Sequence, residues 1–126
     1  MTETTGVRVT SETGGQKDAK VERYDLIDPD FLKELATQLG LGAEKYEEWN
    51  WSRGYPLSLS YAALMRHLQA WWSGERRDPE FGTDHMAAVA FHAMVLFVNG
   101  RALDAGVLPA DMDSRRGDVP KLGVDG

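Results

Sequence analysis

The sequence contains no cysteine, which excludes a disulfide framework, a thiolate metal site and a cysteine nucleophile. It also lacks a P-loop, a GxGxxG fingerprint and a GxSxG motif, so neither the common nucleotide-binding loops nor serine chemistry is supported. The first residues do not combine a basic segment with an apolar one and therefore do not resemble a secretory signal. We expect a cytoplasmic protein.

Long hydrophobic runs and positive charge are also scarce. The longest apolar run, residues 86–98, is interrupted by His92 and is shorter than the roughly 20 residues of a membrane span, so we predict a buried helix and no membrane partner. The net charge is −6, and the segment 17–100 holds nine basic and 13 acidic residues. Such a chain repels nucleic acid. It can bind a polyanionic nucleotide if divalent cations lie between its carboxylates and the phosphates.

The periodicity of apolar residues predicts an all-α fold. Four helices are expected, at residues 29–39, 42–49, 58–72 and 84–99, with Asp28 and Thr83 as N-caps and Gly40 and Gly74 as stops. We divide the chain into a flexible tail at 1–16, a compact, four-helix bundle-like domain at 17–100 and a C-terminal tail at 101–126. Because so few helical residues bury little surface alone, we expect a homo-oligomer, a dimer or a tetramer, on which the tails can pack.

Two groups of acidic residues are candidates for metal binding. Glu44, Glu47 and Glu48 have i, i+3 and i+4 spacing, which on a helix places three like charges on one face. Glu75 and Asp78 belong to a second group in the loop before residue 84, and carboxylate oxygens of such a loop suit hard cations. Each group is equally compatible with a solvated, charged surface.

The histidines and the aromatic residues add further candidates. His85 is expected to open a helix beside acidic residues, where it can serve as a ligand, whereas we interpret His92 as a structural histidine. Asn50 and Trp51 can pair with and stack on a base. The other tryptophans more often indicate core or interface packing.

Three segments carry a resemblance to a known family. The segments GGQKDAKVERYDLI, GAEKYEEWNW and YAALMRHLQAWWSGERRDPEFGTDHMAAVAFHAMVLF resemble the phage-associated dATP/dGTP diphosphohydrolases, a MazG-like, MazZ-type group, over residues 14–99. The resemblance implies an oligomeric, all-α nucleoside triphosphate pyrophosphohydrolase that depends on Mg²⁺ or Mn²⁺. Its implied substrate is a purine deoxynucleoside triphosphate, dGTP or dATP, in a phage that remodels the nucleotide pool.

The MazG-like signature, EExxE followed by ExxD, is matched in part. Glu44 and Glu47 match the last two acids of its first half, where Ala43 replaces the first glutamate, and Glu75 and Asp78 match the second half by spacing. An alignment by the apolar run would place His85 and Ala88 at the second half instead. The resulting hypothesis gives Glu44 and Glu47 catalytic roles. It assigns the metal to Glu44, Glu47, Glu75, Asp78 and His85, and the substrate to Lys45, Asn50, Trp51, Arg66 and His67.

Two other functions remain compatible with the sequence. One is a nucleotide-binding protein without catalysis, because alanine stands where an acid is expected. The other is a helical interaction module whose acidic residues are solvated.

Overall fold

The computed structural model describes residues 6–115, which form two compact units that divide between Leu32 and Lys33. Three α-helices dominate, and the expected all-α fold is confirmed. They are α1 (Pro29–Lys45), α2 (Leu57–Trp72) and α3 (His85–Asp104). The described residues also include the short 3-10 turns η1 (Tyr24–Leu26), η2 (Asn50–Arg53) and η3 (Ala110–Met112).

Helix α1 begins as predicted but does not end where predicted. The Asp28 carboxylate accepts a hydrogen bond from Phe31 N at 2.8 Å, and Pro29 is the first helical residue. The helix then continues through Gly40 and Gly42, neither of which has a positive φ, so the prediction of two separate helices is wrong. Glycine in a helix costs about 1 kcal/mol relative to alanine, which the rest of the helix can offset. The expected second helix is thus the last turn of α1.

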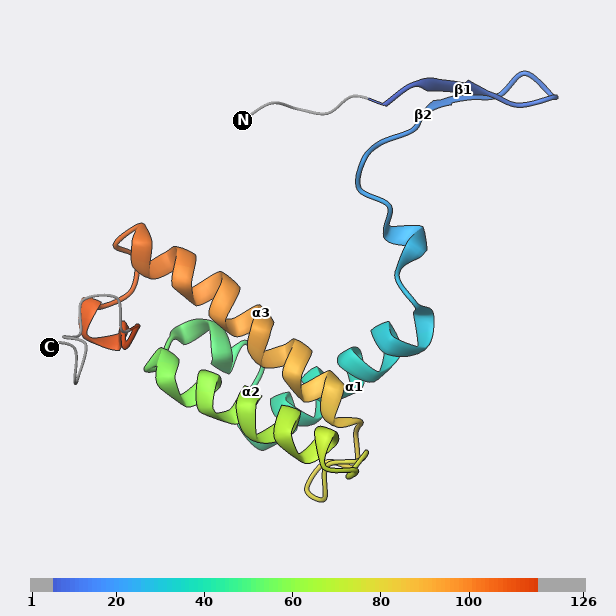
Figure 1. Ribbon diagram of the computed structural model, residues 1–126. Coiled ribbons are helices and arrows are strands. Elements are labelled where there is room, and N and C mark those ends of the chain that lie inside the picture. The colour runs from blue at the N-terminus through green and yellow to red at the C-terminus, as the bar shows by residue number, and fades with distance from the viewer. Residues whose placement is uncertain (1–5, 116–126) are drawn as a thin grey trace, which may run out of the picture. The chain divides into compact units, whose positions relative to one another are not determined.

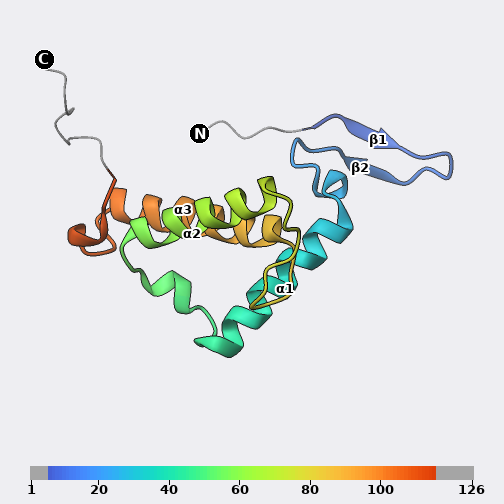
Figure 2. The same ribbon diagram turned by 60° about the horizontal axis from the view of Figure 1, so that its bottom comes forward.

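Helices α2 and α3 lie side by side and run antiparallel (Figure 1, Figure 2). The side chains of Ala87, Ala88 and Val95 in α3 are fully buried, and the two alanines allow a close approach between helices. The expected helix at 58–72 is confirmed. The expected fourth helix is also present, but its N-cap is Asp84. It continues to Asp104, since Gly100 does not adopt the positive φ with which glycine commonly ends a helix.

Helix α3 is long and apolar enough to cross a membrane when judged by length and composition alone. Two of its buried residues are polar, however. His85 is 2% exposed and Asn99 is 1% exposed, and both donate or accept hydrogen bonds within the protein. Of the apolar window of this helix, 28% is buried within the protein.

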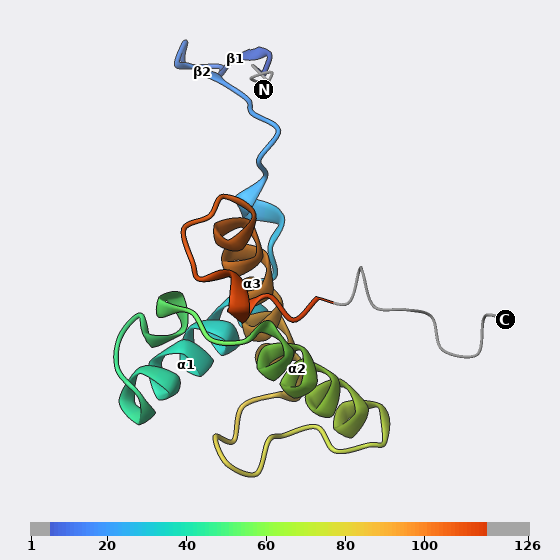
Figure 3. The same cartoon turned by 90° about the vertical axis from the view of Figure 1, so that its left-hand side faces the viewer.

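The segments outside the helices are more ordered than the sequence patterns predicted. Strands β1 (Arg8–Thr10) and β2 (Gln16–Asp18) form an antiparallel hairpin where we expected a tail without regular structure. At the other end, residues 105–115 turn back beside the start of α2 (Figure 3), where Ser58 N donates to Ser114 Oγ at 2.8 Å. Gly54, with a φ of 91°, leaves room there for Leu108 and Met112. The rest of the predicted tails, residues 1–5 and 116–126, lies outside the described residues.

Candidate functional site

A cavity of about 850 Å³ lies in the second unit, between the last turns of α1, the segment 46–55, α2, the loop 73–84 and α3. Seven of the ten predicted site residues line it: Lys45, Glu47, Asn50, Trp51, Arg66, His67 and Asp78. Glu44, Glu75 and His85 are outside its lining. The fold therefore brings most of the predicted residues to one cavity, although they come from four separate segments.

Three side chains at this cavity form a group that can hold a metal ion. One ligand atom each from His67, Asp78 and His85 lie within 4.8 Å of one another. His67 Nδ1 and His85 Nδ1 are 2.9 Å apart, and His85 Nε2 lies 2.8 Å from Glu75 Oε1. Since a carboxylate is an acceptor, we assign the proton of His85 to Nε2, which leaves its Nδ1 with a lone pair facing His67. Burial lowers the pKa of His67, with the nearby Asp78 acting in the opposite direction.

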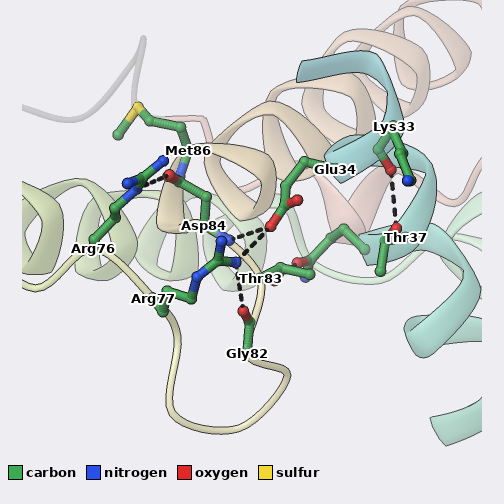
Figure 4. Close-up of polar contacts among 10 residues, drawn as sticks. Lys33, Glu34, Thr37, Arg76, Arg77, Gly82, Thr83, Asp84 and Met86 are labelled. Carbon is green, nitrogen blue, oxygen red and sulfur yellow. Dashed lines mark hydrogen bonds and ion pairs between the residues drawn. The ribbon is translucent and has the colours of Figure 1, made fainter. Parts of the chain in front are cut away.

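The loop 73–84 positions this group, because Asp78 lies within the loop and His85 follows it. Arg77 Nη1 donates to Glu34 Oε2 at 3.0 Å and to the Gly82 carbonyl at 2.9 Å (Figure 4). The same Glu34 oxygen accepts from Asp84 N at 2.8 Å. One glutamate of α1 thus ties together both halves of the loop. The backbone pairs as well, with a bridge between Arg77 and Asp84.

Asp84 caps α3 and fixes the orientation of its first turn. Its Oδ1 accepts from Met86 N at 2.8 Å, and its Oδ2 accepts from Arg76 Nε at 3.2 Å (Figure 4). Burial acts to raise the pKa of Asp84, but these two contacts outweigh it and hold the pKa below its usual range. Thr83, the expected cap, instead donates its hydroxyl hydrogen to the buried Gln38 Oε1 at 2.5 Å.

The predicted acidic face of Glu44, Glu47 and Glu48 is not formed. Helix α1 ends at Lys45, so the last two glutamates lie in the following turn, and all three are exposed. Glu47 forms an ion pair with Arg53 at 2.9 Å. The metal-capable group found among residues 6–115 includes neither Glu44 nor Glu47.

His92 lines the cavity and belongs to a polar network beneath it. Its Nδ1 is 3.0 Å from the Oγ of Ser60, which is fully buried and lies 2.6 Å from Tyr55 Oη. The ring stacks on His67 with a centroid distance of 6.1 Å. Burial lowers the pKa of His92 to about 4, and the nearby His67 and Arg66 act in the same direction. We expected a structural role for His92, and in the structure it is hydrogen-bonded to Ser60 at the wall of the cavity.

Cations and aromatic rings occupy other parts of the wall. Lys45 Nζ lies 2.6 Å from Glu80 Oε2, and this contact raises the pKa of Lys45. Arg66 lines the cavity without an ion pair to another residue of 6–115. Trp49 has a left-handed backbone, with a φ of 64°, and its side chain is 68% exposed. Its ring centroid is 5.9 Å from that of Trp51.

Two of these features were missed by the sequence patterns. We assigned His67 to the substrate, and it lines the cavity but also contacts His85, which the patterns did not indicate. We expected core or interface packing for Trp49, which is exposed at the cavity. A signal for His67 was present, since Arg66-His67 belongs to a segment that carries the resemblance. No local pattern marks Trp49.

The fold and the site define an all-α protein with a cavity at which imidazole and carboxylate groups able to hold a divalent cation meet. The chain belongs to the family described as dATP/dGTP diphosphohydrolase, N-terminal, whose model matches residues 11–104. A dATP/dGTP diphosphohydrolase of Salmonella phage PMBT28 is 33% identical over 85 residues, which cover 68% of this chain. That alignment covers only 29% of the relative's length. No solved structure matches the chain.

Proposed function

We propose that this protein hydrolyses a purine deoxynucleoside triphosphate, dGTP or dATP, to the monophosphate and pyrophosphate. The family and the name of the phage relative support this reaction. The observation that carries it is the cavity itself, at which aromatic, cationic and metal-capable side chains meet. The reaction would take place in the cytoplasm of an infected bacterial cell and would serve to remodel the nucleotide pool of a phage.

The size and the wall of the cavity suit a nucleotide. Ligand cavities commonly measure about 300–1,000 Å³, a range that includes the 850 Å³ found here. The exposed ring of Trp49 and the neighbouring Trp51 offer a stacking surface for the base, and Asn50 offers amide groups for its edge. Arg66 and Lys45 offer positive charge to the phosphates.

The residues of the metal-capable group fit a divalent cation. Asp78 and His85, both predicted as ligands, are joined there by His67, and Glu75 contacts His85 from behind. A cation held by this group supplies positive charge that offsets the charge of the triphosphate near the attacked phosphorus. Among the predicted carboxylates of α1, Glu47 lines the cavity and Glu44 does not.

Glu47 is our choice of general base. In the reaction, the oxygen of a water molecule bonds to the α-phosphorus while the bond from that phosphorus to the bridging oxygen breaks and pyrophosphate leaves. Glu47 accepts the proton that the water loses, and Arg66 or Lys45 binds the negative charge on the departing pyrophosphate. For Glu47 to act, its ion pair with Arg53 must open, which costs little because both side chains are more than half exposed.

The test is to incubate the protein with dGTP, dATP and their ribose counterparts, with Mn²⁺ or Mg²⁺, and to measure monophosphate and pyrophosphate. We expect equal amounts of both products. Glu47→Gln is expected to abolish turnover, while the exposed carboxylate variant Asp111→Asn retains it with the same helical circular dichroism spectrum. Absence of product from every nucleotide would refute the proposed reaction.

A nucleotide-binding protein without catalysis is the second candidate, and one feature favours it. Two of the acids at the cavity, Glu47 and Glu80, form ion pairs with Arg53 and Lys45, and the signature acid at position 43 is alanine. Such a wall can bind a nucleotide without activating water. Tight binding of dGTP or dATP, followed by recovery of unchanged nucleotide after denaturation, would support this alternative.

A homo-oligomer, dimer or tetramer, completes the proposal. The buried apolar residues are few, namely Leu57, Ala87, Ala88 and Val95, while large apolar side chains of the second unit remain exposed. Trp72 is 78% exposed and Phe97 is 62% exposed. Exposed apolar area of this kind commonly marks an interface between subunits. Light scattering of the purified protein should give a mass of two or four times the 14.0 kDa of one chain. A monomer at all concentrations would contradict this part of the proposal.

A further inference from the structure

We infer that His67, Asp78 and His85 form a mixed imidazole and carboxylate site that prefers a first-row transition-metal ion to Mg²⁺, and that Glu75 orients His85. The inference rests on the proposed function, because it assigns the cation that the reaction would use. Compared with the ligand set expected from the sequence, the inference adds His67 and omits Glu44 and Glu47. It makes Glu75 a hydrogen-bond partner of His85 and not a metal ligand.

The spacing of the donor atoms fits a single ion. Two nitrogens that each lie about 2.1 Å from one metal ion are separated by about 3.0 Å at a right angle and by about 3.4 Å at the tetrahedral angle. His67 Nδ1 and His85 Nδ1 are 2.9 Å apart, and an Asp78 oxygen lies within 4.8 Å of both histidines. Asp78 Oδ2 accepts a hydrogen bond from Phe81 N at 2.9 Å, which restricts the rotation of the carboxylate.

Glu75 contacts the ring nitrogen of His85 that does not face His67, as carboxylates commonly do in proteins where the other ring nitrogen binds a metal ion. Such histidines almost always donate the hydrogen of their second ring nitrogen to a carboxylate, a carbonyl or water, which orients the ring and makes the free nitrogen a better ligand. His85 is 2% exposed, and its Nε2 lies 2.8 Å from Glu75 Oε1. This contact leaves the His85 Nδ1 lone pair directed at His67. Glu75 is thus a positioning residue.

The third histidine of the chain is held differently. The Nδ1 atom of His92 is occupied by Ser60, whose side chain is fully buried. His92 stacks on His67 and restricts the position of that ring without offering the same nitrogen. Of the three histidines in the chain, His92 is therefore the one that the proposed ligand set leaves out.

The donor set determines which ion is preferred. Mg²⁺ is bound mainly by oxygen and releases its water reluctantly, whereas two imidazoles and one carboxylate suit Zn²⁺, Co²⁺ and Fe²⁺, with Mn²⁺ at the weak end of the series. Three protein ligands also leave positions open for water or substrate. His67 and Asp78 line the cavity, so those open positions would face a bound nucleotide.

The test is a titration of the metal-free protein with Co²⁺, Mn²⁺ and Mg²⁺ in the absence of nucleotide, followed by calorimetry and by the visible spectrum of Co²⁺. We expect one ion per chain, with Co²⁺ bound more tightly than Mn²⁺ and Mg²⁺ at least ten times more weakly than Mn²⁺. The Co²⁺ spectrum should show intensified bands that indicate nitrogen ligands. Equal affinity for Mg²⁺ and Mn²⁺ would overturn the inference.

The variants locate the site. His67→Gln and Asp78→Asn should each lower Co²⁺ affinity at least a hundredfold, whereas Asp111→Asn, at an exposed carboxylate outside the site, should change it less than threefold. Glu75→Gln should lower it about tenfold and shift the Co²⁺ bands, without lowering the melting temperature of the metal-free protein. Loss of Co²⁺ binding in Glu47→Gln, or unchanged binding in His67→Gln, would refute the assignment.

The inference and the proposed function can fail separately. If Co²⁺ binds as described and no triphosphate is hydrolysed, the metal site stands and the reaction does not. If His67→Gln hydrolyses the triphosphate with Mg²⁺ at the rate of the unaltered protein, the reaction stands and the metal site is refuted.

Discussion

The half-buried His92 at the wall of the cavity predicts how stability depends on pH. His92 has a pKa of about 4 in the folded protein, chiefly because burial disfavours its charged form, against 6.5 in the unfolded chain. Between these two values the unfolded chain binds a proton and the folded protein does not. Stability from this group is therefore fully present above pH 6.5 and is lost as the pH falls from 6.5 toward 4.

The size of the effect follows from the two pKa values. A difference between 6.5 and about 4 corresponds to about 3 kcal/mol, at about 1.4 kcal/mol for each pH unit. The ring is half-buried, so solvent screens part of this energy, and we expect a loss of about 1–2 kcal/mol. His67, whose pKa is also lowered by burial, acts in the same direction. The contribution of His92 must therefore be measured as a difference between proteins.

The measurement is urea unfolding at pH 7.5 and at pH 4.5, in chelator, for the unaltered protein and for His92→Gln. Glutamine does not titrate, so the variant loses a pH-independent amount through its contact with Ser60 but lacks the proton-linked loss. The unaltered protein should lose about 1–2 kcal/mol more than the variant between the two pH values. Equal losses in the two proteins would show that burial of this imidazole does not set its pKa.

Three further substitutions test the structure. Asp84→Ala should lower the free energy of unfolding by about 1–2 kcal/mol, because α3 loses its cap, and an unchanged urea midpoint would contradict that role. Val95→Ala removes part of a fully buried side chain and should lower the free energy of unfolding by about 1–3 kcal/mol in the same measurement. A loss below about 0.5 kcal/mol, which is typical of surface substitutions, would contradict its place in the core. Trp49→Gly should raise the melting temperature, because the backbone φ of 64° at this position costs a bulky residue about 1 kcal/mol. The same variant should bind nucleotide more weakly in a fluorescence titration, and tighter binding would contradict stacking of the base on Trp49.

Much of the fold follows from local patterns. The start of α1 was predictable because Asp28 and Pro29 form a cap and a first turn by themselves, whatever surrounds them. The end of α1 was not, since in isolation Gly40 looks like a stop and Gly42 like the start of a new helix. Whether a glycine ends a helix depends on whether the backbone adopts a positive φ there, and neither residue does. The same limit explains Thr83, whose hydroxyl is used by Gln38, so the cap falls one residue later.

The candidate site was also predictable only in part from the sequence. Sequence pattern indicated the types of residue that the site needs, because acidic side chains recur in the segments 44–48 and 75–84 and His85 follows directly after the second. The helical face of Glu44, Glu47 and Glu48 failed as a prediction because it assumed that the helix continues beyond Lys45. The pairing of His67 with His85 joins residues of different helices across a loop, and no local spacing encodes such a contact.

The sequence by itself determined the all-α class, the starts of α1 and α3 to within a residue, and a chemistry based on carboxylates, imidazoles and cations with cysteine excluded. These properties depend on composition and on interactions within about four residues of the chain, which can be read from neighbouring positions. The tertiary structure alone decided which acids meet which histidines. That outcome depends on how α2, α3 and the loop 73–84 pack, and on Glu34, which holds both halves of that loop from a helix far away in the sequence.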